Sequence, residues 1–584
     1  MLDPTPSSHP DLPLRAADFG TIAEALDYAA GGPTGLNFFT GKGALVEALP
    51  YRTLREQAIA AARHLLGAGL EPGDRVGIVA ENDGDFVRAF FACQYAALVP
   101  VPLPLPAVFG GKAGYVAHLR RMLEAARANA LFGPAALEPW LQDVAAGLNL
   151  KIVGAVGALE GIAPAAGALP PQDPLGIAYL QFSSGSTRFP SGVAVTQRAL
   201  LVNTRETGRS GLQAVAGDRA VSWLPFYHDM GLVGFLLMPT AFQRSVDIVP
   251  TAEFARRPLV WLELISRHRG TVSYGPSFGY ELCTRRAERA SLEGLDLSCW
   301  RSAGIGGDLI RPNVLARFAE RFERHGFDAN AFLPSYGMAE ATLTLCVAPL
   351  RRGARQDTVE ASVLETRHHA VPAHGGSHRT RTFVVCGRIL PGHELEVRDE
   401  SGRRLPDRRV GRIFVRGPSL MAGYYGAPEE TARVLARDGW LDTGDLGYLL
   451  DGEIVITGRA KDLIIVNGRN LWPQDIEWTV ESEVDALRSG DVAAFSVLGD
   501  PHEEVVVLLQ CRIRDPGERD ALIRRVAGLV RSRHDVDATV VLVPPHALPQ
   551  TTSGKLSRSR ARALYLAGDF TEPSEPVTAR AQGE

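Results

Sequence analysis

The sequence has few cysteines and no long apolar run, and both shortages narrow the classes of protein it could be. Its six cysteines are scattered through 584 residues without a Cys-x-x-Cys pair, which argues against a structural zinc site and against a disulfide framework. No uncharged apolar run reaches the roughly 18 residues that a membrane-spanning helix needs. The first 20 residues lack the basic start and apolar core of a signal peptide. We therefore expect a cytoplasmic protein with buried, reduced thiols and no stable membrane insertion.

A strong charge of either sign is also missing. The chain has 62 basic and 66 acidic residues and a net charge of -4, so there is no electrostatic reason to expect nucleic acid as a partner. With 45% hydrophobic and 22% charged residues, the composition is that of a globular protein with an ample core. The expected partner is a small molecule or another protein.

Strand and helix patterns alternate along the first part of the chain. An Ala- and Leu-rich helix follows the capping-box pattern Thr53-Leu-Arg-Glu56, and a turn at 72–74 leads into the apolar strand pattern of residues 76–80. A helix at about 84–97 and a strand near 98–101 complete a βαβ unit. We therefore predict an α/β fold whose large N-terminal domain, residues 1–460, consists of α/β subdomains with mostly parallel sheets.

The elements become smaller after residue 460, which predicts a second, α+β domain over residues 461–567. Pro473 opens a helix with Ile476, Val480 and Val484 on one face, and apolar strand patterns follow it. Residues 568–584 are polar and contain repeated Pro and Glu, so we expect a disordered tail.

A glycine- and serine-rich loop without a lysine follows the apolar run at 176–180. Its small residues would let successive backbone N–H groups surround an anion, with the hydroxyls as further donors. Taken alone, the same composition also fits an ordinary hairpin loop. The residues concerned are Ser183, Ser184, Gly185, Ser186 and Thr187, followed by Arg188, the only cation of the loop.

Two further stretches carry groups suited to a nucleotide. In the first, Tyr336 could stack on a base, and Glu340 could hold Mg²⁺. In the second, Asp445 could bind a ribose diol, with Arg459 near it. The plainer alternatives are a helix start for the first stretch and a surface hairpin around 449–454 for the second.

Together these stretches, in this order and at these spacings, resemble the core motifs of the adenylate-forming superfamily of acyl-CoA synthetases, adenylation domains and luciferases. The resemblance runs from about residue 20 to 566 and is closest to the fatty acyl-AMP ligase branch. Acyl-CoA synthetases usually end the loop with Pro-Lys-Gly, whereas this chain has Pro190-Ser191-Gly192 and shares the missing lysine with that branch. The segments that match the branch are 180–188, 224–231, 254–258, 386–392 and 468–477.

The resemblance implies a role for each site residue. Lys555 would bridge carboxylate and phosphate oxygens, His228 would position the acyl carboxylate, and Glu340 with Thr187 would hold Mg²⁺. Lys461 would be the hinge that makes the C-terminal domain mobile. Taken alone, Lys555 and His228 would be read as a solvated lysine and a structural histidine. The implied nucleotide-binding residues are Ser183, Ser184, Gly185, Ser186, Thr187, Gly306, Gly307, Asp308, Tyr336, Gly337, Met338, Asp445 and Arg459.

The implied reaction is attack of a medium- or long-chain fatty carboxylate on the α-phosphate of ATP, which yields acyl-adenylate and pyrophosphate. The implied acceptor is the phosphopantetheine thiol of an acyl carrier protein or of a carrier domain in a polyketide or nonribosomal peptide synthase. An insertion at 348–382 is expected to pack on the large domain, restrict the swing of the C-terminal domain and disfavour free CoA.

Two alternatives stay open. A long-chain fatty acyl-CoA ligase would use the same adenylate chemistry with CoA as acceptor. A non-catalytic acyl- or nucleotide-binding protein is suggested by the adenine-lining segment, where relatives commonly have Asn-Gly-Ala-Glu and this chain has Ile305-Gly306-Gly307-Asp308.

Overall fold

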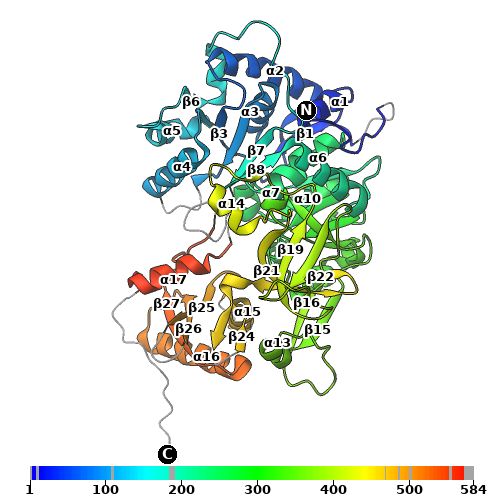
Figure 1. The fold of residues 1–584 in the computed structure, drawn as a ribbon. Coiled ribbons are helices and arrows are strands. Elements are labelled where there is room, and N and C mark those ends of the chain that lie inside the picture. Colours follow the sequence, from blue (N-terminus) through cyan, green and yellow to red (C-terminus); the bar gives the residue numbers. More distant parts are fainter. Residues whose placement is uncertain are drawn as a thin grey trace, which may run out of the picture.

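The computed structural model describes residues 3–7, 12–106, 111–182, 191–466, 469–484, 487–498, 503–551 and 555–570. A large N-terminal body, blue to yellow in Figure 1, is followed by a small orange and red unit at one end of the molecule. Most of the predicted tail, residues 571–584, lies outside the described part.

A nine-stranded sheet organises the described part of the large body. Its order is β17 (Arg388–Ile389), β14 (Thr344–Val347), β13 (Phe332–Gly337), β12 (Ser302–Ile305), β11 (Val272–Gly275), β9 (Arg219–Ser222), β10 (Ser245–Ile248), β1 (Gly35–Phe39) and β2 (Leu45–Pro50). The strands from β13 to β1 are parallel, and β14, β17 and β2 pair antiparallel at the edges. The carboxyl ends of the parallel strands therefore meet at one edge, where open α/β sheets bind ligands.

A second sheet is entirely parallel, in the order β4 (Val99–Leu103), β3 (Arg75–Val79), β5 (Ala130–Gly133) and β6 (Ile152–Ala155). Beside it, β20 (Gly423–Tyr424), β8 (Gly192–Thr196) and β7 (Ile177–Phe182) form an antiparallel sheet. The predicted α/β fold with mostly parallel sheets is confirmed.

A four-stranded antiparallel sheet, which the sequence did not suggest, completes the large body. It consists of β18 (Glu394–Arg398), β19 (Gly411–Arg416), β21 (Leu441–Leu450) and β22 (Glu453–Arg459). The hairpin between β21 and β22 turns at Asp451 and Gly452, which have φ of 55° and 76°. Both angles are positive, as a tight hairpin turn requires, so the hairpin named as the plainer alternative for this stretch is present, directly after the strand that carries Asp445.

Helices surround these sheets, and one predicted helix start is wrong. Helix α2 begins at Tyr51, so Thr53 lies inside it and does not cap it. Pro50 holds the N-cap position with φ of -57°, because its ring is already set for a helix start. The helices of the body are α1 (Ile22–Ala29), α2 (Tyr51–Gly67), α3 (Gly84–Tyr95), α4 (Lys112–Ala126), α5 (Glu138–Ala145), α6 (Gln197–Glu206), α7 (Asp229–Leu232), α8 (Met238–Ala241), α9 (Thr251–Arg256), α10 (Leu259–His268), α11 (Ser277–Ala287), α12 (Pro312–Phe322) and α14 (Pro428–Val434).

The small unit has a hydrophobic core of its own. Ile476, Val480 and Val484 are buried together against its sheet, as their helical spacing predicted. The limits drawn at residues 460 and 567 stay a prediction. The elements are β23 (Ile464–Val466), β24 (Arg469–Leu471), α15 (Pro473–Glu483), β25 (Val492–Leu498), β26 (Glu503–Gln510), α16 (Pro516–His534), β27 (Ala538–Val543) and α17 (Arg558–Ala567).

The segment predicted as an insertion, 348–382, is folded. Strand β15 (Gln356–Glu360) pairs with β16 (Thr380–Val384), and α13 (Ala361–Arg367) follows β15. Val359 and Leu364 are buried in one cluster with Tyr448 of β21 and Trp472 of the small unit. The segment therefore contacts the large body and the small unit at once.

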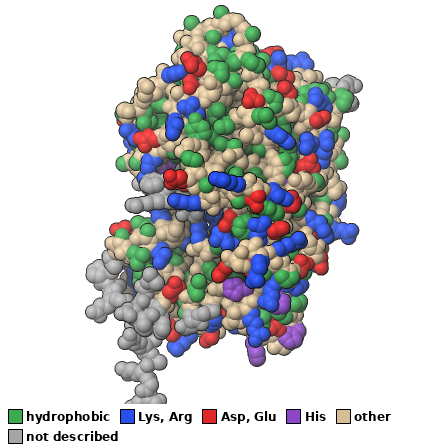
Figure 2. All heavy atoms as spheres, viewed as in Figure 1, with side chains coloured by type: hydrophobic (Ala, Val, Ile, Leu, Met, Phe, Trp, Pro, Cys, Tyr) green, Lys and Arg blue, Asp and Glu red, His purple; other side chains and the backbone are tan. Residues whose placement is uncertain are grey.

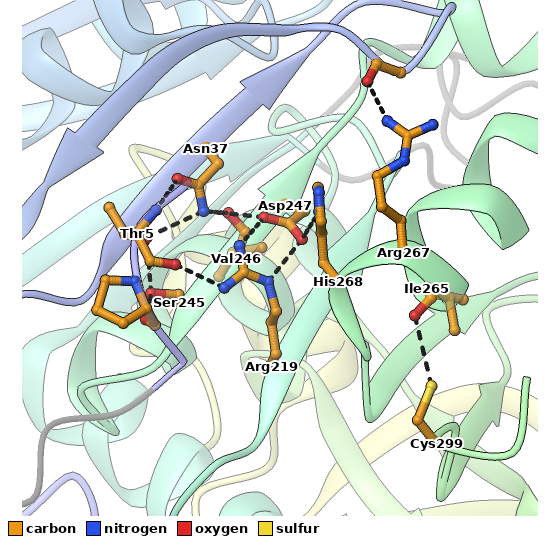
Figure 3. A network of polar contacts seen from close by, with 12 residues as sticks. Thr5, Asn37, Arg219, Ser245, Val246, Asp247, Ile265, Arg267, His268 and Cys299 are labelled. Atoms are coloured by element: carbon orange, nitrogen blue, oxygen red, sulfur yellow. Dashed lines mark hydrogen bonds and ion pairs between the residues drawn. The ribbon is translucent and has the colours of Figure 1, made fainter. Parts of the chain in front are cut away.

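A buried polar network fastens the N-terminal segment to the large sheet (Figure 3). Arg219 and Asp247 form an ion pair of 2.5 Å, and Nδ1 of His268 lies 2.9 Å from the same carboxylate. Arg219 also donates to the carbonyl of Thr5, and the side chain of Asn37 bonds both Thr5 and Asp247. These contacts hold residues far apart in the sequence on neighbouring strands of one sheet.

All six cysteines are free, and four of them are buried. Within the described ranges, no helix combines the length and the apolar character needed to cross a membrane.

Candidate active site

A cavity of about 580 Å³ lies between the carboxyl edge of the nine-stranded sheet, the four-stranded antiparallel sheet and the small unit. Lys and Arg side chains are gathered across the middle of the face shown in Figure 2, over the boundary between body and small unit.

Most of the predicted site residues line this cavity. The structure brings together His228, Gly306, Gly307, Tyr336, Gly337, Met338, Glu340, Asp445, Arg459, Lys461 and Lys555. Asp308 follows Gly307 directly, with Oδ1 at 3.5 Å from Oγ of Ser277. The predicted loop residues Ser183, Ser184, Gly185, Ser186 and Thr187 lie outside the described part of the chain.

The residues expected to hold a ribose come from two sheets. Tyr336, on β13, donates a hydrogen bond of 2.7 Å to Asp445 on β21, and Nε of Arg459 lies 3.4 Å from the same carboxylate. Burial raises the pKa of Asp445, while Arg459 and the bond from Tyr336 oppose this rise. The tyrosine predicted to face a base is thus also the group that fixes the carboxylate beside it.

Lys555 reaches into the cavity from the small unit. Its ammonium group donates a hydrogen bond to the carbonyl of Gly307. Gly307 has φ of 82°, and a Cβ there would lie 3.3 Å from Cε of Met230 and 3.9 Å from Nζ of Lys555, so glycine suits both the backbone and the approach of the lysine. Burial lowers the pKa of Lys555, and the carboxylates of Asp308 and Asp229 partly offset this effect.

Glu340 is a buried carboxylate in the wall of the cavity. Its Oε1 accepts a hydrogen bond of 2.9 Å from Tyr424. Burial raises the pKa of Glu340, whereas the bond from Tyr424 and the charge of Arg459 lower it. No group of three His, Cys, Asp or Glu able to hold a metal occurs among the described residues.

Asp229 is a site residue that the sequence reasoning missed. Its Oδ1 lies 2.7 Å from Nδ1 of His228, and it also accepts from the backbone N–H of Met230 at 2.6 Å. Nδ1 of His228 itself accepts from the same Met230 N–H at 3.3 Å, so the two side chains share one backbone donor at the start of α7. Although burial opposes ionisation, His228 and Lys555 lower the pKa of Asp229. Its position next to His228 in the His-Asp-Met-Gly stretch was the available signal.

The cavity also has apolar lining residues, which single motifs could not reveal. Its walls come from helical segments and strand ends distant in the sequence, including the π-helical turn Val233–Leu237. The apolar residues that line it include Leu212, Phe235, Met238, Val272 and Leu343. One cavity thus has both charged and apolar lining residues, as an acyl substrate attached to a nucleotide would require.

Comparison with known proteins agrees with this geometry. Residues 38–425 match the model of the AMP-binding enzyme family. The chain is 54% identical, over 98% of its length and 99% of the relative, to a Caulobacter vibrioides protein named provisionally as an acyl-CoA synthetase. It is 32% identical, over 96% and 97% of the two chains, to the medium-chain-fatty-acid–[acyl-carrier-protein] ligase JamA of Moorena producens.

A solved structure is similar over almost the whole fold. It comes from a study of fatty acyl-adenylate ligases of E. coli and L. pneumophila, with a TM-score of 0.91, 45% identity and coverage of 95% of this chain and 100% of the other. The resemblance to fatty acyl-AMP ligases drawn from the motifs is therefore confirmed for the fold as a whole. The chain belongs to the family of AMP-binding enzymes and is an adenylate-forming ligase.

Proposed function

We propose that this enzyme activates a medium- or long-chain fatty acid to its acyl-adenylate and passes the acyl group to the phosphopantetheine thiol of a carrier protein. The observation that carries the first step is one cavity lined both by Lys555, Asp445 and Glu340 and by a set of apolar side chains. Fatty acyl-adenylate ligases and a fatty-acid–carrier-protein ligase are among the similar proteins, which supports both the acid and the acceptor.

In the proposed reaction, the fatty carboxylate attacks the α-phosphorus of ATP, the new P–O bond forms, and pyrophosphate leaves with the electrons of the broken bond. The chain supplies alignment and charge rather than covalent help. Lys555 would neutralise the carboxylate and phosphate oxygens, and His228, held by Asp229, would orient the carboxylate. Asp445, held by Tyr336, would bind the ribose hydroxyls.

Glu340 fits a magnesium ion that accompanies ATP. It is a buried carboxylate in the cavity wall whose Oε1 accepts from Tyr424, and Mg²⁺ commonly binds one or two carboxylates together with substrate phosphates. Bound there, the ion would neutralise charge on the leaving pyrophosphate. Thr187 would be its second protein ligand.

The 348–382 segment supports a carrier thiol over free CoA as the acceptor. It binds the small unit through Glu365 and Arg469 at 2.7 Å, and through Arg381 and Asp475 at 3.0 Å. These ties would limit rotation of the small unit, which CoA-dependent transfer would need. A second candidate function is that of a fatty acyl-CoA ligase. It is favoured by the provisional name of the relative from Caulobacter vibrioides, an acyl-CoA synthetase.

The test is a panel of octanoic, dodecanoic and hexadecanoic acids with ATP and Mg²⁺, scored for acyl-AMP by mass spectrometry and for pyrophosphate release. Acyl-AMP with at least one acid, and little acyl-CoA when CoA is added, is the expected result. Efficient acyl-CoA formation would establish the second candidate. Absence of ATP–pyrophosphate exchange with every acid would instead mean that the protein only binds its ligands.

A further inference from the structure

The small unit meets the segment after β12 at two points. The carbonyl of Gly307 accepts the hydrogen bond from Lys555, and Arg311, four residues later, forms an ion pair of 3.0 Å with Glu481 of α15. The Arg311 guanidinium also lies 4.9 Å from the ring centroid of Trp478, on the same side of α15 as Glu481. One short segment of the large body therefore contacts both Lys555 and helix α15.

Both partners of this ion pair are held firmly. The backbone N–H of Arg311 donates to Oγ of Ser277 at 3.3 Å, and Arg311 is the residue that precedes helix α12. Glu481 accepts a bond of 2.6 Å from the backbone N–H of Gly490 through its other oxygen. The two side chains are 18% and 6% exposed. The pair is thus nearly buried at the junction of body and small unit.

A buried ion pair adds little net stability, because desolvation offsets its attraction, but one partner left buried and unpaired is costly. Placements of the small unit that bury Glu481 away from Arg311 are therefore disfavoured. The pair selects one placement rather than strengthening contact in general.

We propose that Arg311 and Glu481 form a clasp that positions the small unit so that Lys555 enters the adenylation site. Neither residue is among those that line the cavity, so both act through Lys555 and are positioning residues. The inference rests on the adenylate-forming function proposed above.

The first test compares steady-state pyrophosphate release with dodecanoate, ATP and Mg²⁺ at about pH 8. Arg311→Met should lower kcat about tenfold and leave KM for ATP within about twofold, because substrates bind to residues that it does not touch. Adding Glu481→Met to this variant should restore kcat to within about threefold of wild type, since no unpaired charge remains. The matched control is Arg317→Met on α12, whose nearest acidic partner, Glu281 at 3.9 Å, belongs to the body itself.

A second measurement separates positioning from a general loss of structure. If the clasp acts through Lys555, Arg311→Met should cause little further loss in a Lys555→Ala background. An equal loss in both backgrounds would overturn the proposal, and so would unchanged kcat in the single Arg311 variant. Glu481→Gln, which keeps the size of the side chain, serves the same tests if Arg311→Met lowers the melting temperature.

Small-angle X-ray scattering gives a readout independent of activity. Arg311→Met should broaden the distribution of interatomic distances relative to wild type and Arg317→Met, and the double variant should narrow it again. An unchanged distribution in Arg311→Met would contradict the clasp. If the wild-type enzyme released no pyrophosphate with any acid, the proposed function would be wrong. The scattering measurement would still test whether Arg311 and Glu481 position the small unit.

Discussion

The hydroxyl of Tyr336 donates a hydrogen bond of 2.7 Å to Asp445, although 109 residues separate them in the sequence. The contact joins β13 of the nine-stranded sheet to β21 of the four-stranded antiparallel sheet. Because Asp445 also lies 3.4 Å from Arg459, its orientation is set from two sides before any nucleotide binds. Such preorganisation favours binding of the ribose hydroxyls.

Tyr336→Phe should therefore weaken ATP binding. Loss of one hydrogen bond to a carboxylate should raise KM for ATP about fivefold and change kcat less than about twofold. Initial rates of pyrophosphate release over a range of ATP concentrations measure both constants. Tyr28→Phe, which removes a hydroxyl bonded to Pro13 at the surface, is the control. A fall in kcat at unchanged KM would contradict this role for Tyr336.

Lys555→Ala should slow adenylation about a hundredfold, because it removes a charged contact made chiefly in the transition state. Transfer of the acyl group from preformed dodecanoyl-AMP to the phosphopantetheine thiol of a carrier protein should suffer much less, because the proposed rotation of the small unit would remove the lysine from the site between the two half-reactions. Both half-reactions can be followed by mass spectrometry. Equal losses in the two would refute a rotation of the small unit between them.

The ties between the 348–382 segment and the small unit predict how CoA is excluded. Arg381 pairs with Asp475 at 3.0 Å and lies 4.4 Å from the ring centroid of Trp472. Arg381→Met should loosen both contacts, leave adenylation within about threefold and raise acyl-CoA yield several-fold. Replacing residues 353–377 with a short Gly/Ser bridge should have the same effect.

The matched control for Arg381→Met is Arg388→Met, whose partner Asp451 lies in the large body. A folded Arg381 variant, or shortened variant, that still adenylates but gains no acyl-CoA would mean that CoA is rejected elsewhere, for want of a surface that binds it.

The clasp predicts a pH dependence. Burial raises the pKa of Glu481 from 4.5 to about 7, with Arg311 lowering it and Glu477 of the same helix raising it further. Glu481 therefore binds a proton more tightly when the small unit is placed with Glu481 against Arg311 than when it is placed with Glu481 in water. The resulting stabilisation is complete below a pH of about 4.5 and is lost as the pH rises through about 7.

Above that range Glu481 is ionised and depends on Arg311 as its partner. The ratio of adenylation rates, wild type over Arg311→Met, should therefore grow between about pH 6 and about pH 8.5. With Glu481→Gln in place of Glu481, the same ratio should stay flat. A ratio that falls with rising pH would show the sign of the argument to be wrong.

The network of Figure 3 predicts a large loss of stability in Asp247→Ala. Two bonds from Arg219, of 2.7 and 2.5 Å, would be left without their acceptor in a fully buried place. Removal of one partner of a buried ion pair costs about 3–5 kcal/mol, which urea unfolding can measure. Asp399→Ala, in an exposed turn, should change stability by less than about 1 kcal/mol.

Local patterns in the sequence determined the elements that depend on neighbours in the chain. The face of Ile476, Val480 and Val484 follows from helical spacing and occurs as predicted. The hairpin at Asp451 and Gly452, given only as the plainer alternative for its stretch, follows from backbone freedom at the turn. The start of α2 differed because Pro50, with its fixed φ, can begin a helix before the capping residue is reached. The motifs were also sufficient to indicate the family, since they combine several rare residues at set distances.

Tertiary structure alone decided which of these elements meet. Three features join residues from separate parts of the chain. They are the antiparallel sheet that carries Asp445, the apolar lining of the cavity, and the ion pair between Arg311 and Glu481. Asp229 follows His228 directly in the sequence. Whether it contacts the histidine and is buried with it depends on the tertiary structure, which the sequence does not show. Local propensity acts over a few residues, whereas desolvation and long-range pairing depend on how the whole chain packs.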